Sequence, residues 1–190
     1  VGFHRKLRGA EGGIVRAHLK IIDWVVANVS VEMGRAEVGP AERLDAGTEI
    51  VPVNIGNPHA VVFVDDPNDV DVPAAGRRIE TDPRFAPGGV NVEFVSVLGR
   101  GALSVRVWER GAGETPASGT GASAAAAAAA AAGRVDRGVI VKMPGGELMA
   151  AVGPDLSVTL AGPVTVTVIR NESPAAMPPS AAWVTVTAAL

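Results

Sequence analysis

The chain has 190 residues, of which 47% are hydrophobic and 19% charged, so it is long enough to bury one sizeable core or two small ones. Its net charge is −3 with scattered Lys and Arg, which argues against nucleic-acid partners, and its most apolar stretch, residues 124–132, is far shorter than the roughly 20 residues of a membrane span. It has no cysteine, which excludes a disulfide framework and a thiolate metal site and makes the cytoplasm the expected compartment.

Short strands dominate the predicted structure. Residues 1–28 carry Arg, Lys and Gly around a short apolar segment and are expected to make no complete unit by themselves. Runs rich in β-branched residues, most of them bounded by Gly, Pro, Asn or Asp, predict strands at residues 60–66, 91–98, 103–109, 139–143, 147–152, 156–160 and 164–169. In the third of these, alternation places Leu103, Val105 and Val107 on one face, which should meet a core. Tight turns between antiparallel neighbours are expected at residues 144–146 and 153–155.

One helix is predicted to interrupt the strands, at residues 122–132. Thr120 or Ser118 can cap its start, and Gly133 stands where a left-handed residue ends a helix. Its alanines give small side chains on every face, whereas an ordinary surface helix shows a polar stripe. We therefore expect a helix enclosed by a curved sheet; the alternative is a low-complexity alanine run.

The loop before this helix is suited to an anion. A helix start offers unpaired N–H groups and the positive end of the helix dipole, and Gly119 and Gly121 allow a ligand to approach the backbone closely. A Walker-type phosphate loop would need a lysine here, and a dinucleotide fingerprint would need a βαβ context. Because the sequence offers neither, a carboxylate is favoured over a phosphate.

Three motifs resemble those of one enzyme family. "ERGAGETPASGTGASAAA" (residues 109–126) resembles the second active-site motif of diaminopimelate epimerases, in which Glu-Arg-Gly-Ala-Gly-Glu-Thr is followed by Ala-Cys-Gly-(Thr/Ser)-Gly-Ala. "NIGNPHAVVFVDD" (residues 54–66) is similar to the family's Gly-Asn-Pro-His-(Cys/Ala)-Val segment. "GGVNVEFV" (residues 88–95) is similar to its Asn-(Val/Ile)-(Glu/Gly)-Phe segment. The motifs occur in the family's order.

The resemblance implies a fold and a division of the chain. The fold is α+β, a roll in which a mainly antiparallel sheet wraps around a central Ala-rich helix. The resemblance covers residues 29–168, the expected C-terminal epimerase-like domain. Residues 1–28 would then be the remnant of an N-terminal half, and residues 169–190, rich in Pro and Ala, an irregular tail.

The resemblance also implies an activity. The family enzyme is an isomerase that interconverts L,L- and meso-diaminopimelate in lysine biosynthesis by two-base α-proton transfer, without a metal or cofactor. Its active site lies between two pseudo-symmetric halves, each of which supplies one cysteine at a helix N-terminus. The implied partners are diaminopimelate and either the missing N-terminal half or a second copy of the chain.

Eight site residues are implied by position in the motifs. Three carry the acid/base chemistry: Ser118, which stands at the cysteine position, Glu109 and His59. Five bind the substrate: Asn57, Asn91, Arg110, Gly119 and Thr120. The chemistry suits these residue types, because a guanidinium fork matches a carboxylate and helix-start N–H groups can stabilise the carbanion.

Each of these residues also has an ordinary structural explanation. His59 follows a proline and can be a turn histidine, and Glu109 and Arg110 can form an exposed pair at a strand end. Asn57 precedes a proline as turn residues do, and Asn91 can simply begin a strand. The ordered set favours the functional interpretation, which no single member would.

Two departures from the family pattern predict an impaired form. Ser118 and Ser123 stand where the family has its catalytic cysteine and, in some members, a second one, and a hydroxyl without an activating base accepts a proton less readily than a thiol of pKa about 8.5. The Cys-Gly-Asn-Gly motif of the N-terminal half is also missing, and the chain begins with Val. We expect a fragment first; an engineered Cys-to-Ser form, a degenerate paralogue or a half that assembles with a partner are the alternatives.

Two other functions stay open. A proline or hydroxyproline racemase-like enzyme can use serine or threonine in place of one cysteine, although "ERGAGET" fits the diaminopimelate group better. A non-catalytic carboxylate-binding or dimerising module is the third possibility, because loss of half the cleft exposes apolar surface. Proton exchange that depends on substrate separates the enzymes from the module.

Overall fold

The computed structural model describes residues 2–9, 13–22, 25–45, 47–162, 164–168 and 184–188. The strands are β1 (Gly2–Gly9), β2 (Gly13–Ile22), β3 (Val25–Arg35), β4 (Glu37–Val38), β5 (Glu42–Arg43), β6 (Glu49–Asn54), β7 (Pro58–Phe63), β8 (Asn91–Gly99), β9 (Ala102–Glu109), β10 (Gly113–Thr115), β11 (Gly138–Met143), β12 (Gly146–Val152), β13 (Ser157–Gly162), β14 (Val164–Val168) and β15 (Val184–Ala188). The helices are α1 (Val72–Glu80) and α2 (Gly119–Ala131), with 3₁₀ turns η1 (Pro67–Asp69) and η2 (Pro83–Phe85).

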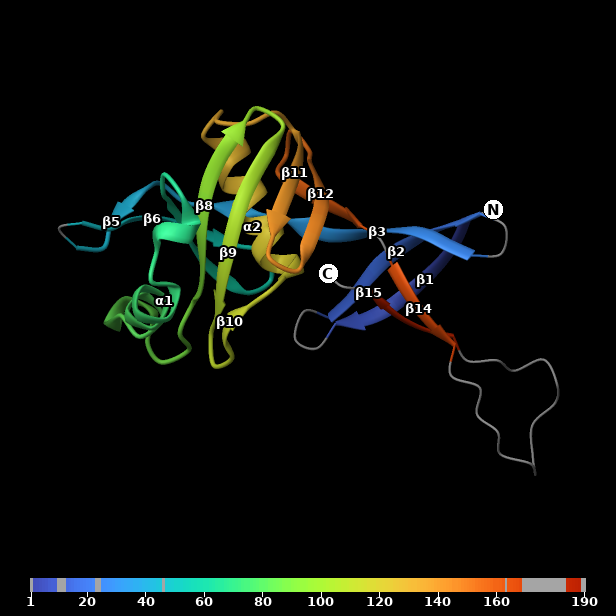
Figure 1. The fold of residues 1–190 in the computed structure, drawn as a ribbon, viewed down its shortest axis with the longest axis horizontal. Helices are drawn as coiled ribbons and strands as arrows, with labels where there is room; N and C mark the ends of the chain where they lie inside the picture. Colours follow the sequence, from blue (N-terminus) through green and yellow to red (C-terminus); the bar gives the residue numbers. More distant parts are fainter. Residues whose placement is uncertain are drawn as a thin grey trace, which may run out of the picture.

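One large sheet organises the molecule (Figure 1). Its order is β1-β2-β3-β13-β12-β11-β9-β8-β7-β6-β4, with β10 beside β9 and β5 beside β6, while β14 and β15 pair separately. Neighbouring strands in the described part of the sheet are antiparallel except β7 with β8 and β9 with β11. The sheet is therefore mainly antiparallel, which confirms the predicted fold class. The predicted turns also join antiparallel neighbours, β11 to β12 and β12 to β13.

The two parallel pairs explain where the helices lie. A parallel connection must cross over the sheet, and here α1 joins β7 to β8 while α2 lies between β9 and β11 in the chain. The two helices pack on opposite faces. Val105 and Val107 of β9 belong to the core around α2, whereas Trp108 belongs to the core beneath α1. The predicted face of β9 thus meets a core, and the other face is covered as well.

Helix α2 is the buried axis of the fold. It contacts β6 to β9 on one side and β11 to β13 on the other, and the side chains of residues 121–129 are buried. Ser118 is the N-cap, with its Oγ accepting from the Gly121 N–H at 3.2 Å, and Gly133 follows the helix with φ +67°. The enclosed helix is confirmed, because alanine leaves room for strands to approach from every side.

Helix α1 is a correction to the prediction of a single helix. Asp71 caps it by accepting from the Ala74 N–H at 3.1 Å, and its Val72 and Ile79 are buried. Gly76 is required there, because a Cβ would overlap the ring of Trp108. The helix has nine residues that include Pro73 and Gly76, so its sequence pattern is too short and interrupted to predict.

The ends of the chain form further strands. Strands β1 to β3 continue the large sheet beyond β13, and the expectation that residues 1–28 make no complete unit by themselves stays a prediction. In the expected irregular tail, residues 184–188 form β15, which pairs with β14; the rest of that tail lies outside the described residues. Figure 1 shows β1, β2, β14 and β15 extending away from the part of the sheet that encloses α2.

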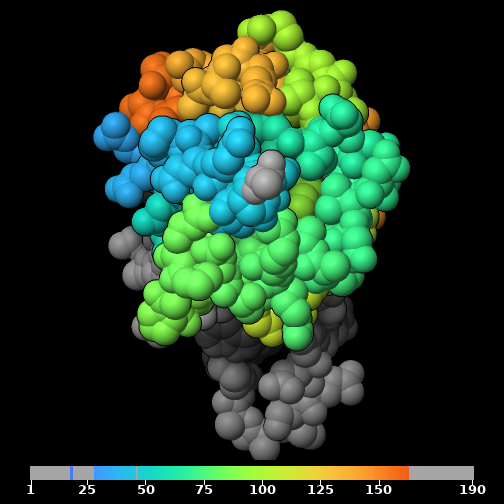
Figure 2. Space-filling model, turned by 90° about the vertical axis from the view of Figure 1, so that its left-hand side faces the viewer, coloured from blue at the N-terminus to red at the C-terminus, as the bar shows by residue number. Residues whose placement is uncertain are grey.

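The segment around β5 lies against α1 and η2. Arg78 of α1 pairs with Asp45, and Arg84 of η2 donates to the backbone oxygens of Arg43 and Leu44. In Figure 2 the corresponding blue and green surfaces adjoin one another. This end of the molecule is thus held by exposed polar contacts, in contrast to the interior around α2.

Candidate functional site

The start of α2 meets the ends of three strands. His59 lies at the second position of β7 and pairs in parallel register with Asn91, the first residue of β8. Glu109 is the last residue of β9, whose residue Val107 pairs with Glu93 of β8. Strand register therefore brings together residues that are far apart in the sequence.

A chain of hydrogen bonds runs from the helix into the sheet. Asn57 Nδ2 donates to Thr120 Oγ1 at 3.4 Å, and Asn57 Oδ1 lies 2.9 Å from His59 Nε2. The other ring nitrogen, Nδ1, lies 2.7 Å from Glu93 Oε1. The side chains of His59 and Glu93 are completely buried. The buried ring excludes the interpretation of His59 as an ordinary exposed turn histidine.

Glu93 is the buried carboxyl group at the end of this series of hydrogen bonds. Burial raises the pKa of its carboxyl group above the ordinary value, because the charged form loses its hydration, and the nearby Glu109 carboxylate raises it further. His59 opposes the shift through its charge and its hydrogen bond. The second oxygen, Oε2, is buried without a hydrogen-bond partner. An unpaired carboxylate is therefore disfavoured in this setting.

A hydrogen bond joins Asn91, at the start of β8, to Arg110, which follows β9. Asn91 Oδ1 accepts from the backbone N–H of Arg110 at 3.0 Å, and its Nδ2 donates to the Pro58 oxygen at 3.3 Å. Arg110 Nη1 donates to the Gly88 oxygen at 3.1 Å. Asn91 does begin a strand, and it also ties the turn after β9 to the start of β7.

The two serines bond to the backbone of α2 itself. Ser118 caps the helix, and Ser123 Oγ donates to the Gly119 oxygen at 2.8 Å. Gly121 lies between Ser118 and the buried carboxylate: a Cβ there would lie 3.2 Å from Ser118 Oγ and 3.0 Å from Glu93 Oε1. The missing side chain of Gly121 therefore lets the helix start and Glu93 approach each other.

Two residues near the site were not singled out from the sequence. Glu93 lies in an apolar strand, where it shares a face with Asn91, and this alternation was the available signal. Glu80 of α1 accepts from Trp108 Nε1 at 2.7 Å and from the Gly111 N–H at 2.8 Å. It thus holds the turn that carries Glu109 and Arg110 from both sides, and nothing in its local sequence indicates this contact.

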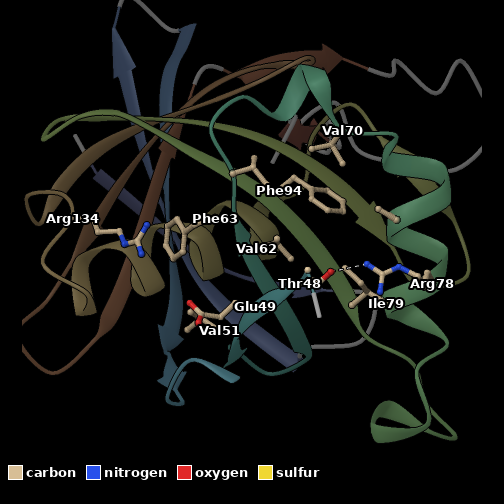
Figure 3. Close-up of a pocket in the computed structure, with 13 residues that line it drawn as sticks. Thr48, Glu49, Val51, Val62, Phe63, Val70, Arg78, Ile79, Phe94 and Arg134 are labelled. Atoms are coloured by element: carbon tan, nitrogen blue, oxygen red, sulfur yellow. Dashed lines mark hydrogen bonds between the residues drawn. The ribbon is translucent and has the colours of Figure 1, made fainter. Parts of the chain in front are cut away.

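One cavity lies beside the site, and another lies away from it. A cavity of about 400 Å³ is lined by Pro58 and His59 together with residues of β4, β6 and η2. Another, of about 430 Å³, lies between α1 and the strands β6 to β8 (Figure 3). In it Arg78 donates to Thr48, and the guanidinium of Arg134 lies 4.0 Å from the ring centre of Phe63. None of the eight predicted site residues lines this second cavity.

The described residues offer neither a metal site nor a membrane-spanning helix. They contain no group of three or more His, Cys, Asp or Glu side chains that could hold a metal ion. None of their helices is long and apolar enough to cross a membrane.

Comparison with known proteins gives concordant results. The family model described as diaminopimelate epimerase matches residues 51–168. The chain is 41% identical over 170 residues to the diaminopimelate epimerase of Geobacillus kaustophilus and 44% identical over 168 residues to that of Desulforudis audaxviator. In both cases the match covers 80% of this chain and 58% of the relative, so the chain spans less than two thirds of their length.

A solved structure shares the fold. The hydroxyproline epimerase of Agrobacterium vitis, crystallised with trans-4-hydroxy-L-proline, superposes with a TM-score of 0.68 over 85% of this chain and 56% of that one, at 18% identity. At this identity the likeness concerns the fold alone. The match of the family model over more than half of the chain, together with the identity to curated relatives, shows that the chain belongs to the diaminopimelate epimerase family.

Proposed function

We propose that this chain supplies one half of a diaminopimelate epimerase active site, in an enzyme that interconverts L,L- and meso-diaminopimelate for lysine biosynthesis. The observation that carries the proposal is the hydrogen-bonded chain from Thr120 through Asn57 and His59 to Glu93, which lies at the start of a buried helix. The second acid/base group would come from the part of the relatives' length that this chain does not span, or from a second copy.

The substrate carboxylate would bind at the start of α2. A helix start leaves its first N–H groups without intrahelical partners, and here these belong to Gly119 and Thr120. An amino-acid α-proton is weakly acidic, so removal of the proton requires donors already aimed at the carboxylate, where negative charge develops. The helix dipole adds to this stabilisation.

The far end of the substrate would be bound by Arg110, Asn57 and Asn91. Arg110 offers a planar guanidinium fork for a carboxylate, and Asn57 and Asn91 offer amide groups to a carboxylate or an ammonium. Glu109 and His59 would assist the groups that move the proton. All of these side chains come from strand ends next to α2.

Ser118 would make this half a weak catalyst. It occupies the position of the family cysteine, and its hydroxyl can donate a proton or a hydrogen bond but is a poor acceptor at neutral pH. A thiol at the same helix start would have a lowered pKa and would act as thiolate. We therefore propose that Ser118 limits this chain and that Ser118→Cys restores proton removal.

The test is proton exchange in D₂O with L,L-diaminopimelate, followed by NMR of the substrate α-proton. One base suffices to exchange this proton with retention of configuration, whereas inversion needs the second half. We expect measurable exchange with Ser118→Cys and little with Ser118. The matched control is Ser123→Cys, which places a thiol in the same helix beyond the site and should not exchange the proton.

Each outcome decides between the candidate functions. Exchange that depends on the thiol at position 118 supports the proposal. Exchange of the α-proton of trans-4-hydroxy-L-proline, but not of diaminopimelate, would favour a hydroxyproline epimerase-type enzyme instead. Binding of diaminopimelate without exchange in either variant would favour a carboxylate-binding module.

A further inference from the structure

The orientation of the Asn57 amide indicates where His59 carries one of its protons. Asn57 Nδ2 faces Thr120 Oγ1 at 3.4 Å, so its oxygen Oδ1 is the atom that faces His59 Nε2, at 2.9 Å. An amide oxygen only accepts hydrogen bonds. With the amide in this orientation, Nε2 of His59 carries a hydrogen.

The contact with Glu93 then holds a second proton. Nδ1 of His59 lies 2.7 Å from Glu93 Oε1. If the ring is neutral, Nδ1 accepts from a protonated carboxyl group; if the ring is charged, Nδ1 donates to a carboxylate. Both arrangements contain one proton between the two atoms and leave the pair neutral overall. An ionised Glu93 beside a neutral Nε2–H ring would instead place two acceptors at hydrogen-bond distance.

Burial favours the neutral pair over either group charged alone. Both side chains are fully buried, and Glu93 Oε2 has no hydrogen-bond partner. An uncompensated charge in such a place is costly. The carboxylate of Glu109, at the end of the neighbouring strand, raises the Glu93 pKa and thus adds to the preference for a proton on the pair.

We propose that Glu93 is a positioning residue of the site, which shares one proton with His59 and thereby holds the ring in its Nε2–H form. This form orients Asn57 toward the start of α2, where the carboxylate would bind. The consequence for binding rests on the proposed function, whereas the protonation state of the ring does not.

The direct test is ¹⁵N NMR of the histidine rings in the full chain. The chain has three histidines, and His59→Gln identifies the signals of His59 by their loss. We expect Nε2 of His59 to carry a hydrogen for as long as the pair retains its shared proton. A neutral ring with the hydrogen on Nδ1 and none on Nε2 would overturn the proposal, because Asn57 and Glu93 would then have the opposite roles.

Two variants separate positioning from mere packing. Glu93→Gln keeps a donor, since its amide N–H can bond to Nδ1, so we expect His59 to retain Nε2–H. Glu93→Leu removes the partner of Nδ1, so we expect both neutral tautomers to appear. The exposed Glu147→Gln of β12 is the matched control and should leave the His59 signals unchanged. Unchanged signals in Glu93→Leu, if it folds, or loss of Nε2–H in Glu93→Gln, would contradict the proposal.

Ligand binding gives a second readout. With diaminopimelate as the probe, we expect Glu93→Leu to raise the Kd about tenfold, as for the loss of one buried hydrogen bond, and Glu93→Gln to change it less than about twofold. If the chain does not bind diaminopimelate but His59 keeps Nε2–H, the proposed function fails and the positioning role stands. If it binds but His59 is the Nδ1–H form, the positioning role alone fails.

Discussion

The two crossover connections of this fold have the same topology and opposite chemistry. Helix α1 joins β7 to β8 on one face of the sheet, and α2 joins the β9–β10 hairpin to β11 on the other. Arg77 and Arg78 of α1 are exposed, whereas Thr120 at the start of α2 accepts from Asn57, which in turn bonds to the buried His59. The comparison indicates that burial of hydrogen-bonded polar groups, and not the crossover itself, sets the candidate site apart from the rest of the fold.

The largest expected effect is the loss of stability when an alanine of α2 is enlarged, compared with the same substitution in α1. Ala126 of α2 is fully buried among strands, while Ala74 of α1 is exposed. We expect Ala126→Leu to lower the free energy of unfolding by about 3 kcal/mol or more through overpacking, and Ala74→Leu to change it by less than about 0.5 kcal/mol. Chemical denaturation measures both. Equal tolerance at the two positions would mean that α2 is not enclosed.

The next effect concerns the contact between α1 and the turn of the site. Glu80 accepts from both Trp108 Nε1 and the Gly111 N–H, so Glu80→Ala leaves two donors without their partner. We expect a loss of about 2 kcal/mol in the free energy of unfolding and faster hydrogen exchange at Gly111. The control is Glu42→Ala, at an exposed position in β5. Protection of Gly111 unchanged in Glu80→Ala would show that α1 does not hold this turn.

The buried carboxyl of Glu93 predicts a pH dependence with a definite sign. Its pKa is raised above the ordinary 4.5, so the folded state binds this proton more tightly than the unfolded state does. The resulting stabilisation is fully present below about pH 4.5 and is lost as the pH rises through the folded pKa. The stability of the natural chain minus that of Glu93→Gln should therefore fall with rising pH, by at most about 1.4 kcal/mol per pH unit.

The subtraction is needed because other groups act in the opposite direction. Hydrogen bonds from neighbouring residues lower the pKa values of the exposed Asp45, Asp82 and Asp155, whose contributions are lost as the pH falls. These contributions are the same in both proteins and cancel. A difference that rises with pH would mean that Glu93 is stabilised as the carboxylate.

The smallest expected effect lies just beyond the C-terminal end of α2. Arg134 lies over the ring of Phe63 beside the outer cavity (Figure 3). Because this guanidinium is exposed, we expect Arg134→Gln to lower the free energy of unfolding by only about 0.5–1 kcal/mol. A double-mutant cycle with Phe63→Leu isolates the interaction. A coupling as large as that of the buried pair His59–Glu93 would contradict the expected difference between exposed and buried contacts.

The sequence predicts the elements that have strong local patterns. The β-branched runs of β8, β9 and β11 and the alanines of α2 have periods or compositions that only one structure accommodates. Helix α1 could not be predicted because Pro73 and Gly76 weaken its pattern and its stability comes from packing against Trp108. The strands β1 and β2 were missed because Arg, Lys and Gly interrupt their apolar pattern. In β3 the alternation of Val29, Val31 and Met33 was an available signal.

Some residues of the candidate site could likewise be predicted from the sequence and others could not. Ser118, His59 and Arg110 were singled out because they lie in motifs that can be read along the chain. Glu93 was missed because a single charge in a strand ordinarily indicates a solvent-facing position, and only the pairing of β7 with β8 brings it to His59. Partners that depend on strand register cannot be found from local sequence.

The most direct measurement is an NMR titration of the backbone amides with L,L-diaminopimelate. The account predicts saturable shifts at Gly119 and Thr120, at the start of α2, and none at Ala74, whose N–H is already bonded to Asp71 at the start of α1. That result would place the carboxylate on the helix whose start is lined by the buried polar chain. Absent shifts at α2, or equal shifts at both helix starts, would contradict the claim that this half binds the substrate.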